Sequence, residues 1–119
     1  MIKLKMIFSK LNINGALLIK PKIFSDERGF FTETWNEKQF NRIAGYNVNF
    51  VQDNLSRSKK DVLRGLHFQI KKPQGKLVKV SNGAVYDVIV DLRASSPTFQ
   101  NWFGVKLSAH NSTMLWVPP

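Results

Sequence analysis

The side chains of this sequence best suited to chemistry lie near its middle, in the stretches Val62–Gln69 and Gln74–Val78. The first stretch holds Arg64 and His67, the second holds Lys76, and a glycine stands beside each cation. Histidine is the side chain best suited to moving protons near neutral pH. Cations around it favour a substrate that carries phosphate. We therefore expect proton-transfer chemistry on an anionic substrate.

His67 and Lys76 together would supply the minimum needed to remove a proton next to a carbonyl group. If a hairpin brings them together, His67 acts as the base and Lys76 stabilises negative charge on the carbonyl oxygen. Two alternatives stay open: a core histidine bonded to a backbone carbonyl, and a solvated loop lysine. Arg64 weighs against the first, because an arginine is costly to bury without an anion. A metal site is disfavoured, since no second histidine or carboxylate stands at ligand spacing from His67.

Other polar side chains stand where predicted strands could present them to a ligand. Gln52 and Asn54 lie two residues apart, hence on one face of a strand, where amides could bind a base or a sugar. Arg28 and Glu33 flank a pair of phenylalanines. Arginine suits a phosphate, an aromatic ring suits stacking on a base, and a carboxylate suits a sugar hydroxyl. These residues are candidates for substrate binding.

Two carboxylates, Asp87 and Asp91, alternate with apolar residues in one predicted strand. A carboxylate inside a strand is disfavoured unless it is paired. Either could therefore orient a histidine or a lysine, or both could face solvent on an antiparallel sheet. The second histidine of the sequence, His110, is expected to be a loop residue without a catalytic part.

The elements that must position these side chains are mostly β. Hydrophobic patterning predicts extended segments over residues 16–24, 30–35, 47–55, 62–69, 77–80, 84–92, 99–107 and 113–117. One short helix is predicted, with Asn36 as its N-cap, Phe40 and Ile43 on one face, and Gly45 at its end. Many short strands with one helix indicate an antiparallel sandwich or barrel.

Length and composition are those of one globular domain over residues 1–119. Apolar residues make up 43% and charged residues 22% of the chain. Cysteine is absent, which excludes disulfides, thiolate metal sites and a cysteine nucleophile. No apolar run is long enough to span a bilayer and no signal-peptide core is visible, so a soluble cytoplasmic protein without a membrane partner is expected.

The net charge of +10 is concentrated in the middle of the chain. Between Arg57 and Lys79 lie eight basic side chains and one acidic side chain, Asp61. Three interpretations stay open: solvated lysine-rich loops, a small anionic ligand bound by Arg64 and Lys76, and nucleic-acid binding. The last is disfavoured, because no helix carries the basic residues and no stacking aromatic motif accompanies them.

The sequence resembles the dTDP-4-dehydrorhamnose 3,5-epimerases, which make the rhamnose precursor of bacterial surface polysaccharides. The resemblance covers nearly the whole chain in order and spacing. It rests on the segments Asp26–Phe31 with Glu33, Gln52–Asn54 with Ser56, Leu63–Gln69, Gln74–Val78, Gly83–Asp91 with Arg93, and Ser96–Phe99.

The resemblance implies a cupin-type jelly roll that works without metal or cofactor, usually as a dimer that exchanges N-terminal strands. It implies that His67 is the general base and that Lys76 stabilises the enolate oxygen. The nucleotide, its pyrophosphate or the sugar would be held by Arg28, Phe31, Glu33, Gln52, Asn54 and Arg64. Asp87, a candidate from the strand pattern, stays a candidate for orienting a histidine or a lysine.

The family's proton-returning tyrosine and histidine-orienting aspartate belong to a C-terminal portion beyond the position of Pro119. We therefore expect a partial, C-terminally incomplete jelly roll that covers its open surfaces by oligomerising or is marginally stable. The leading hypothesis is a dTDP-4-dehydro-6-deoxy-D-glucose 3,5-epimerase sequence. The alternatives are a weak or inactive nucleotide-sugar-binding module and a sugar 3,4-ketoisomerase. A metal-dependent cupin is least favoured, for want of a His-x-His pair.

Overall fold

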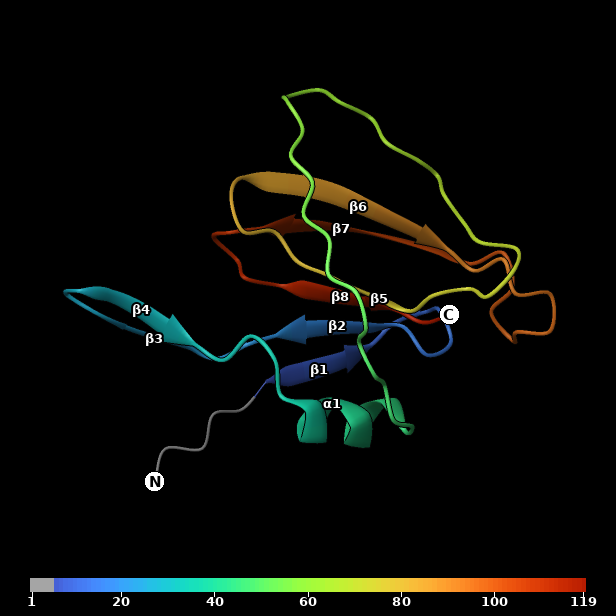
Figure 1. Ribbon diagram of the computed structural model, residues 1–119, viewed down its shortest axis with the longest axis horizontal. Helices are drawn as coiled ribbons and strands as arrows, with labels where there is room; N and C mark the ends of the chain where they lie inside the picture. Colours follow the sequence, from blue (N-terminus) through green and yellow to red (C-terminus); the bar gives the residue numbers. More distant parts are fainter. Residues whose placement is uncertain (1–5) are drawn as a thin grey trace.

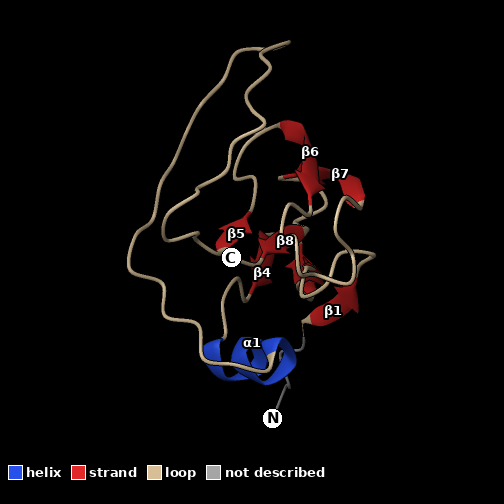
Figure 2. Cartoon of the chain, turned by 90° about the vertical axis from the view of Figure 1, so that its right-hand side faces the viewer, coloured by secondary structure: helices blue, strands red, loops and turns tan. Residues whose placement is uncertain are grey.

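The computed structural model describes residues 6–119 as a mostly β structure with one short helix (Figures 1 and 2). In chain order the elements are β1 Ile7–Lys10, β2 Leu17–Lys20, β3 Ile23–Asp26, β4 Gly29–Thr32, α1 Glu37–Ala44, β5 Lys76–Val78, β6 Ala84–Val90, β7 Trp102–Ser108 and β8 Met114–Val117. All strand pairs are antiparallel. The predicted class, antiparallel β with one short helix, is confirmed.

The largest sheet has the strand order β1-β2-β8-β5. β8, from the C-terminal end of the chain, lies between β2 and β5 (Figure 1). A strand with neighbours on both edges and layers on both faces is buried, and the apolar run Met114–Trp116 matches that environment. The remaining strands form two separate hairpins, β3–β4 and β6–β7.

The two faces of this sheet have different roles. The register places Leu17 and Leu77 opposite Trp116, so these three side chains share one face. Phe40 of α1 packs on that face in a buried core cluster made of Leu17, Ile19, Phe40, Met114 and Trp116. The other face looks toward the β6–β7 hairpin, on the side of the sheet away from α1 (Figure 2). Because side chains alternate along a strand, Lys76 points to this second face.

The helix forms where the sequence predicted it, because its start and end signals are local. The Asn36 side chain accepts a hydrogen bond from the Gln39 backbone N–H at 3.0 Å, as an N-cap does. Gly45 ends the helix in the left-handed conformation, with φ of 83°. Phe40 is 1% exposed and packs edge-on against Trp116, with ring centroids 5.0 Å apart.

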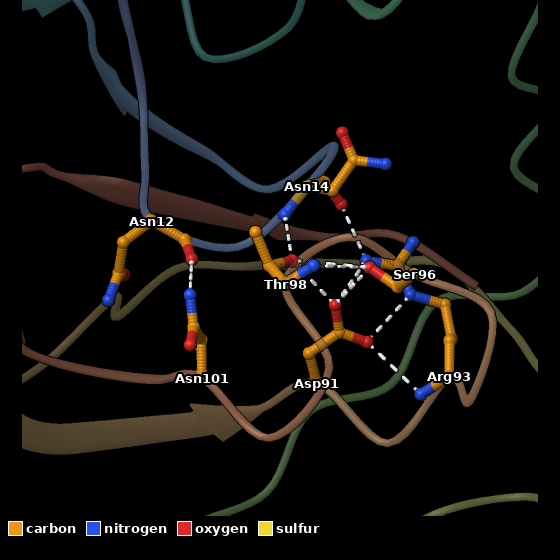
Figure 3. Close-up of polar contacts among 7 residues, drawn as sticks. All are labelled: Asn12, Asn14, Asp91, Arg93, Ser96, Thr98 and Asn101. Atoms are coloured by element: carbon orange, nitrogen blue, oxygen red, sulfur yellow. Dashed lines mark hydrogen bonds and ion pairs between the residues drawn. The ribbon is translucent and has the colours of Figure 1, made fainter.

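A hydrogen-bond network joins the turn before β2 to the connection between β6 and β7 (Figure 3). We call it the Asp91 network; it comprises Asn12, Asn14, Asp91, Arg93, Ser96, Thr98 and Asn101. The Asp91 carboxylate accepts hydrogen bonds from Arg93 Nε at 2.9 Å, Ser96 Oγ at 2.6 Å and Thr98 Oγ1 at 2.7 Å. Arg93 Nη2 then donates to the Asn14 carbonyl at 2.6 Å. The network thus connects the large sheet to the β6–β7 hairpin.

Two strand predictions are wrong. Residues 47–55 and 62–69 were expected to be strands, but residues 47–75, which we call the connecting segment, contain no helix or strand. The segment loops away from the sheets (Figure 1), and Leu63, Leu66 and Phe68 are 92%, 71% and 66% exposed. Alternating apolar residues form a strand only where a neighbouring strand completes the hydrogen-bond ladder, and no such pairing involves this segment among residues 6–119. The sequence also gave no prediction for β1.

Candidate active site

The predicted site residues lie in three parts of the structure. Arg28 and Phe31 lie on the β3–β4 hairpin, and Glu33 follows it directly. Lys76 begins β5 and Asp87 lies in β6. The connecting segment carries the others, which are Gln52, Asn54, Arg64 and His67.

The β3–β4 hairpin presents a cation and two aromatic rings to solvent. Arg28 donates to the Asp26 carboxylate through Nε at 3.1 Å and Nη2 at 2.5 Å. These bonds lower the pKa of Asp26, while the Arg28 side chain stays 84% exposed. Phe30 and Phe31 are 67% and 63% exposed. An open hollow of about 390 Å³ is lined by Phe24, Ser25, Asp26, Arg28, Gly29, Phe30 and Phe31. Such a surface suits an anion attached to a flat ring.

Glu33 lies between the β3–β4 hairpin and α1. One carboxylate oxygen, Oε2, lies 3.4 Å from Asn36 Nδ2, the N-cap side chain. The other, Oε1, is buried and has no hydrogen-bond partner among residues 6–119. A buried acceptor without a donor is costly unless a further group completes it. Glu33 therefore has the geometry to accept a hydrogen bond from a ligand.

The connecting segment holds its polar side chains by local contacts only. Gln52 Nε2 donates to Asn54 Oδ1 at 3.2 Å, and Arg64 Nε donates to Ser58 Oγ at 2.8 Å. His67 is exposed, so the alternative of a core histidine bonded to a backbone carbonyl is wrong. It is wrong because the segment pairs with no strand among the described residues. The exposed imidazole remains accessible to a substrate.

Lys76 connects the sheet to the segment that carries the histidine. Its Nζ donates a hydrogen bond to Gln69 Oε1 at 3.2 Å. Gln69 stands two residues after His67, so this contact brings the histidine segment next to the predicted charge-stabilising lysine. The bond joins Lys76 to Gln69, and the roles of His67 as base and Lys76 as charge stabiliser stay predictions.

Asp87 in β6 and Asp91, just after β6, have opposite environments. Asp87 is half-buried, and desolvation raises its pKa. At Asp91 the hydrogen bond from Arg93 is the main cause of a pKa held far below its usual range, with Ser96 and Thr98 adding to it. Asp91 therefore holds an arginine and not the histidine or lysine suggested by the sequence. The orienting role of Asp87 stays a prediction.

Sequence reasoning missed the contacts of three residues that bear on the site: Gln69, Gly75 and Trp116. Gln69 stood only at the end of the predicted segment 62–69. A Cβ at Gly75 would lie 2.3 Å from Trp116 Cη2, so the ring occupies the space of the missing side chain. Two features of the sequence hinted at the contact between Gly75 and Trp116: a glycine next to the predicted site lysine, and a tryptophan within an apolar strand. Only the sheet register shows that they meet.

Residues 6–119 contain no group of three histidine or acidic side chains placed to hold a metal ion. Within the same range, no helix has the length and apolar character needed to cross a bilayer.

Comparisons with known proteins match this chain to one family. The sequence profile of the dTDP-4-dehydrorhamnose 3,5-epimerases matches residues 10–119. The protein of that name from Pseudomonas aeruginosa is 51% identical over 110 residues, which cover 92% of this chain and 61% of the relative. The Salmonella typhimurium protein is 54% identical over 114 residues, or 95% of this chain and 62% of the relative. The chain thus spans about three fifths of the length of these relatives.

Solved structures give the same result. The dTDP-4-dehydrorhamnose 3,5-epimerase of Elizabethkingia anophelis superposes with a TM-score of 0.89 at 47% identity, over 95% of this chain and 62% of that one. The Legionella pneumophila epimerase, solved in complex with dTDP-4-keto-L-rhamnose, has a TM-score of 0.89 at 49% identity, over 96% and 61%. The Bacillus anthracis epimerase, with TDP and PPi bound, has a TM-score of 0.88 at 47% identity, over 96% and 66%.

Proposed function

This chain belongs to the dTDP-4-dehydrorhamnose 3,5-epimerase family, and we propose that it acts in the epimerisation of dTDP-4-dehydro-6-deoxy-D-glucose at C3 and C5. The observation that carries the proposal is the family match over residues 10–119. The hydrogen bond between Lys76 and Gln69, beside His67, supports it. The Legionella relative, solved with a dTDP-linked keto sugar, supports the choice of substrate.

The reaction needs a base and a stabiliser of negative charge. The C4 ketone makes the protons on C3 and C5 removable, because the electron pair left on carbon moves into the carbonyl group as an enolate. His67 takes the proton, and the Lys76 ammonium group stabilises the enolate oxygen. A proton returned to the opposite face of the same carbon inverts that centre. No atom is gained or lost, so the step needs no oxidant or reductant.

The remaining candidates would bind the nucleotide and the sugar. Arg28 and Arg64 are exposed cations that suit the pyrophosphate, and Phe31 offers a ring on which the base can stack. Glu33 has an unpartnered carboxylate oxygen for a sugar hydroxyl or a base N–H. Gln52 and Asn54 present a bonded pair of amides to the same ligand.

Exchange of solvent deuterium into the substrate tests the base directly. We expect C3 and C5 of the keto sugar to take up deuterium, and His67→Ala to slow uptake by about 10²–10⁴-fold. The matched control is His110→Ala, because His110 is the other histidine and lies in an exposed turn. Mass spectrometry and NMR measure the label. Uptake that H67A leaves unchanged would exclude His67 as the base.

We further propose that the working unit is a homodimer. The β3–β4 hairpin extends from the large sheet away from β5 within one chain (Figure 1). A second copy that brings its hairpin to the His67 segment would complete the site. Exposed Phe30 and Phe31 give the hairpin apolar area to bury in such a contact. In a two-fold dimer both sites would then be composite.

Complementation between two inactive variants tests the composite site. Arg28→Ala and His67→Ala are each expected to lose activity as homodimers. Mixed dimers contain one site with both residues intact, so mixing with subunit exchange should restore roughly a quarter of the wild-type activity. Light scattering measures the oligomeric state in the same samples. Dimers that show no recovery would place both residues in one subunit's site, and a monomer would overturn the dimer proposal.

A cytoplasmic location and a role in dTDP-L-rhamnose biosynthesis complete the proposal. Both are supported by the family match and by a water-soluble nucleotide sugar as the substrate. Cell fractionation with an antibody against the chain measures the location. Loss of rhamnose from surface polysaccharide after gene deletion would support the pathway, and unchanged rhamnose would contradict it.

A further inference from the structure

The space beside Gly75 is filled by the ring of Trp116. A Cβ added at Gly75 would lie 2.3, 3.0 and 3.1 Å from three carbon atoms of that ring. Carbon atoms that are not bonded do not approach to 2.3 Å, because repulsion rises steeply below about 3.5 Å. As long as the ring keeps its place, residue 75 has to be glycine.

The ring of Trp116 is held firmly. Trp116 is 1% exposed and lies in β8, which pairs on both edges. Phe40 packs edge-on against it at 5.0 Å between centroids, and Phe50 does so at 5.9 Å. A clash at residue 75 would therefore displace the start of β5 and not the ring.

The contact between Gly75 and Trp116 fixes the backbone at the residue just before Lys76. Lys76 follows Gly75 directly and pairs with Val117, so its side chain leaves the sheet on the face opposite the Trp116 ring. On that side its Nζ donates to Gln69 Oε1 at 3.2 Å. The Trp116 ring thus fixes the position of the Lys76 backbone, and Gln69 fixes the position of its ammonium group.

We propose that Trp116, acting through Gly75, and Gln69 are positioning residues for Lys76. The inference rests on the proposed function, in which Lys76 stabilises the enolate. Gln69 has a second effect, because it stands two residues after His67 and connects the segment of the base to the lysine. These contacts hold the base and the cation at a fixed spacing.

The contact depends on the ring and not on the indole N–H. Trp116 Nε1 is buried and has no hydrogen-bond partner among residues 6–119. Trp116→Phe keeps a smaller aromatic ring but loses the outer indole carbons that contact Gly75, whereas Trp116→Leu removes the aromatic ring altogether. Both variants therefore open the space beside Gly75, and Trp116→Leu does so more completely.

The first experiment measures how fast the Lys76 amine is acetylated, followed by peptide mass spectrometry at constant pH. Lys79 serves as the internal control, because it is exposed and stands three residues further along the chain. Gln69→Leu removes the acceptor, and we expect Lys76 to react about two- to tenfold faster relative to Lys79. Gln69→Glu keeps an acceptor oxygen and adds a negative charge that favours the ammonium form, so the ratio should not rise above that of the wild type. An unchanged ratio in Q69L overturns the role of Gln69.

The second experiment tests the ring with the same measurement. Gly75→Ala and Trp116→Leu should each raise the acetylation rate of Lys76 relative to Lys79, and W116F should raise it to a smaller extent. G75A should have a smaller effect in a W116L background, because the clashing ring is gone. Gly104→Ala is the matched control, since its Cβ would also lie 2.3 Å from a neighbour, the mobile end of exposed Tyr86. Additive effects of G75A and W116L overturn the role of the ring.

Kinetics then connect the positioning to the reaction. Q69L and G75A should lower kcat with little change in KM, because a misplaced Lys76 weakens the stabilisation of the enolate and not substrate binding. A rise in KM alone would overturn the positioning role. The acetylation ratio requires no turnover, so it still tests the contacts if the proposed epimerase activity fails.

Discussion

The Asp91 network and the connecting segment show two ways in which this chain uses polar side chains. In the network a fully buried carboxylate is bonded by an arginine and two hydroxyl groups, all within a few residues of it. In the segment the polar groups are exposed and make isolated contacts, such as the one from Arg64 to Ser58. The network has its partners within the protein, while the segment leaves its groups free for a ligand. The comparison predicts that substitutions in the network cost more stability than substitutions in the segment.

Removing Asp91 gives the largest expected loss of stability. Asp91→Ala leaves the Ser96 and Thr98 hydroxyls without their acceptor and frees Arg93, which is only partly exposed, so we expect a loss of about 2–3 kcal/mol. The control in the connecting segment is Asp53→Ala, an exposed carboxylate expected to change stability by less than about 0.5 kcal/mol. Urea unfolding measures both. Equal losses would remove the distinction between the two regions.

Acid should weaken the Asp91 network. The pKa of Asp91 is lowered in the folded state, so its stabilisation is present above about pH 4, the unfolded value, and is lost as the pH falls further. Asp87 has a raised pKa, so its contribution to stability changes with pH in the opposite direction. Because Asp87 is present in both the wild type and D91A, this contribution cancels when the two proteins are compared. The stability difference between these proteins should therefore shrink between about pH 4 and pH 2. A difference constant over this range would contradict the assignment.

Two serines, Ser96 in the network and Ser58 in the connecting segment, should differ less in their contributions to stability. Ser96→Ala removes a 2.6 Å hydrogen bond to the buried carboxylate, and we expect a loss of about 1–2 kcal/mol. Ser58→Ala removes the exposed bond to Arg64, with an expected change below about 0.5 kcal/mol. The same unfolding measurement compares them. A larger loss in S58A would show that the segment contributes to the folded core.

The smallest expected effect on stability is that of His67→Ala. The side chain is exposed on the connecting segment, so we expect a change within about 0.5 kcal/mol. The same variant is expected to lose exchange activity, which makes it the clearest case of a residue that serves function alone. Thermal unfolding checks it. A clear fall in Tm would indicate that His67 has a partner in the fold.

Local signals in the sequence were sufficient for the helix. Asn36 and Gly45 mark its ends through contacts within a few residues, and Phe40 marks its buried face. Strands with partners, such as β6 and β7, were also predictable, because each is a seven-residue run with regular alternation. The predictions at 47–55 and 62–69 failed, since a strand depends on a neighbour that no local pattern supplies.

Contacts between distant residues were beyond prediction. Arg93 reaches the Asn14 carbonyl across 79 positions of sequence, and Asn101 reaches Asn12 across 89. Nothing in the local pattern of either segment indicates its partner. The contact between Lys76 and Gln69 was also not predicted, and the direction of the lysine required the register of β5 with β8.

By itself, the sequence determined which chemical groups this protein has and where the helix and most strands form, because propensity, capping and alternation are local properties. Its motifs also pointed to the epimerase family. Only the tertiary structure decided that Asp91 is part of a buried network, that His67 is exposed, and that Trp116 requires glycine at residue 75. The physical reason is that burial and close contact depend on which distant segments meet, and β8 decides this by lying between β2 and β5.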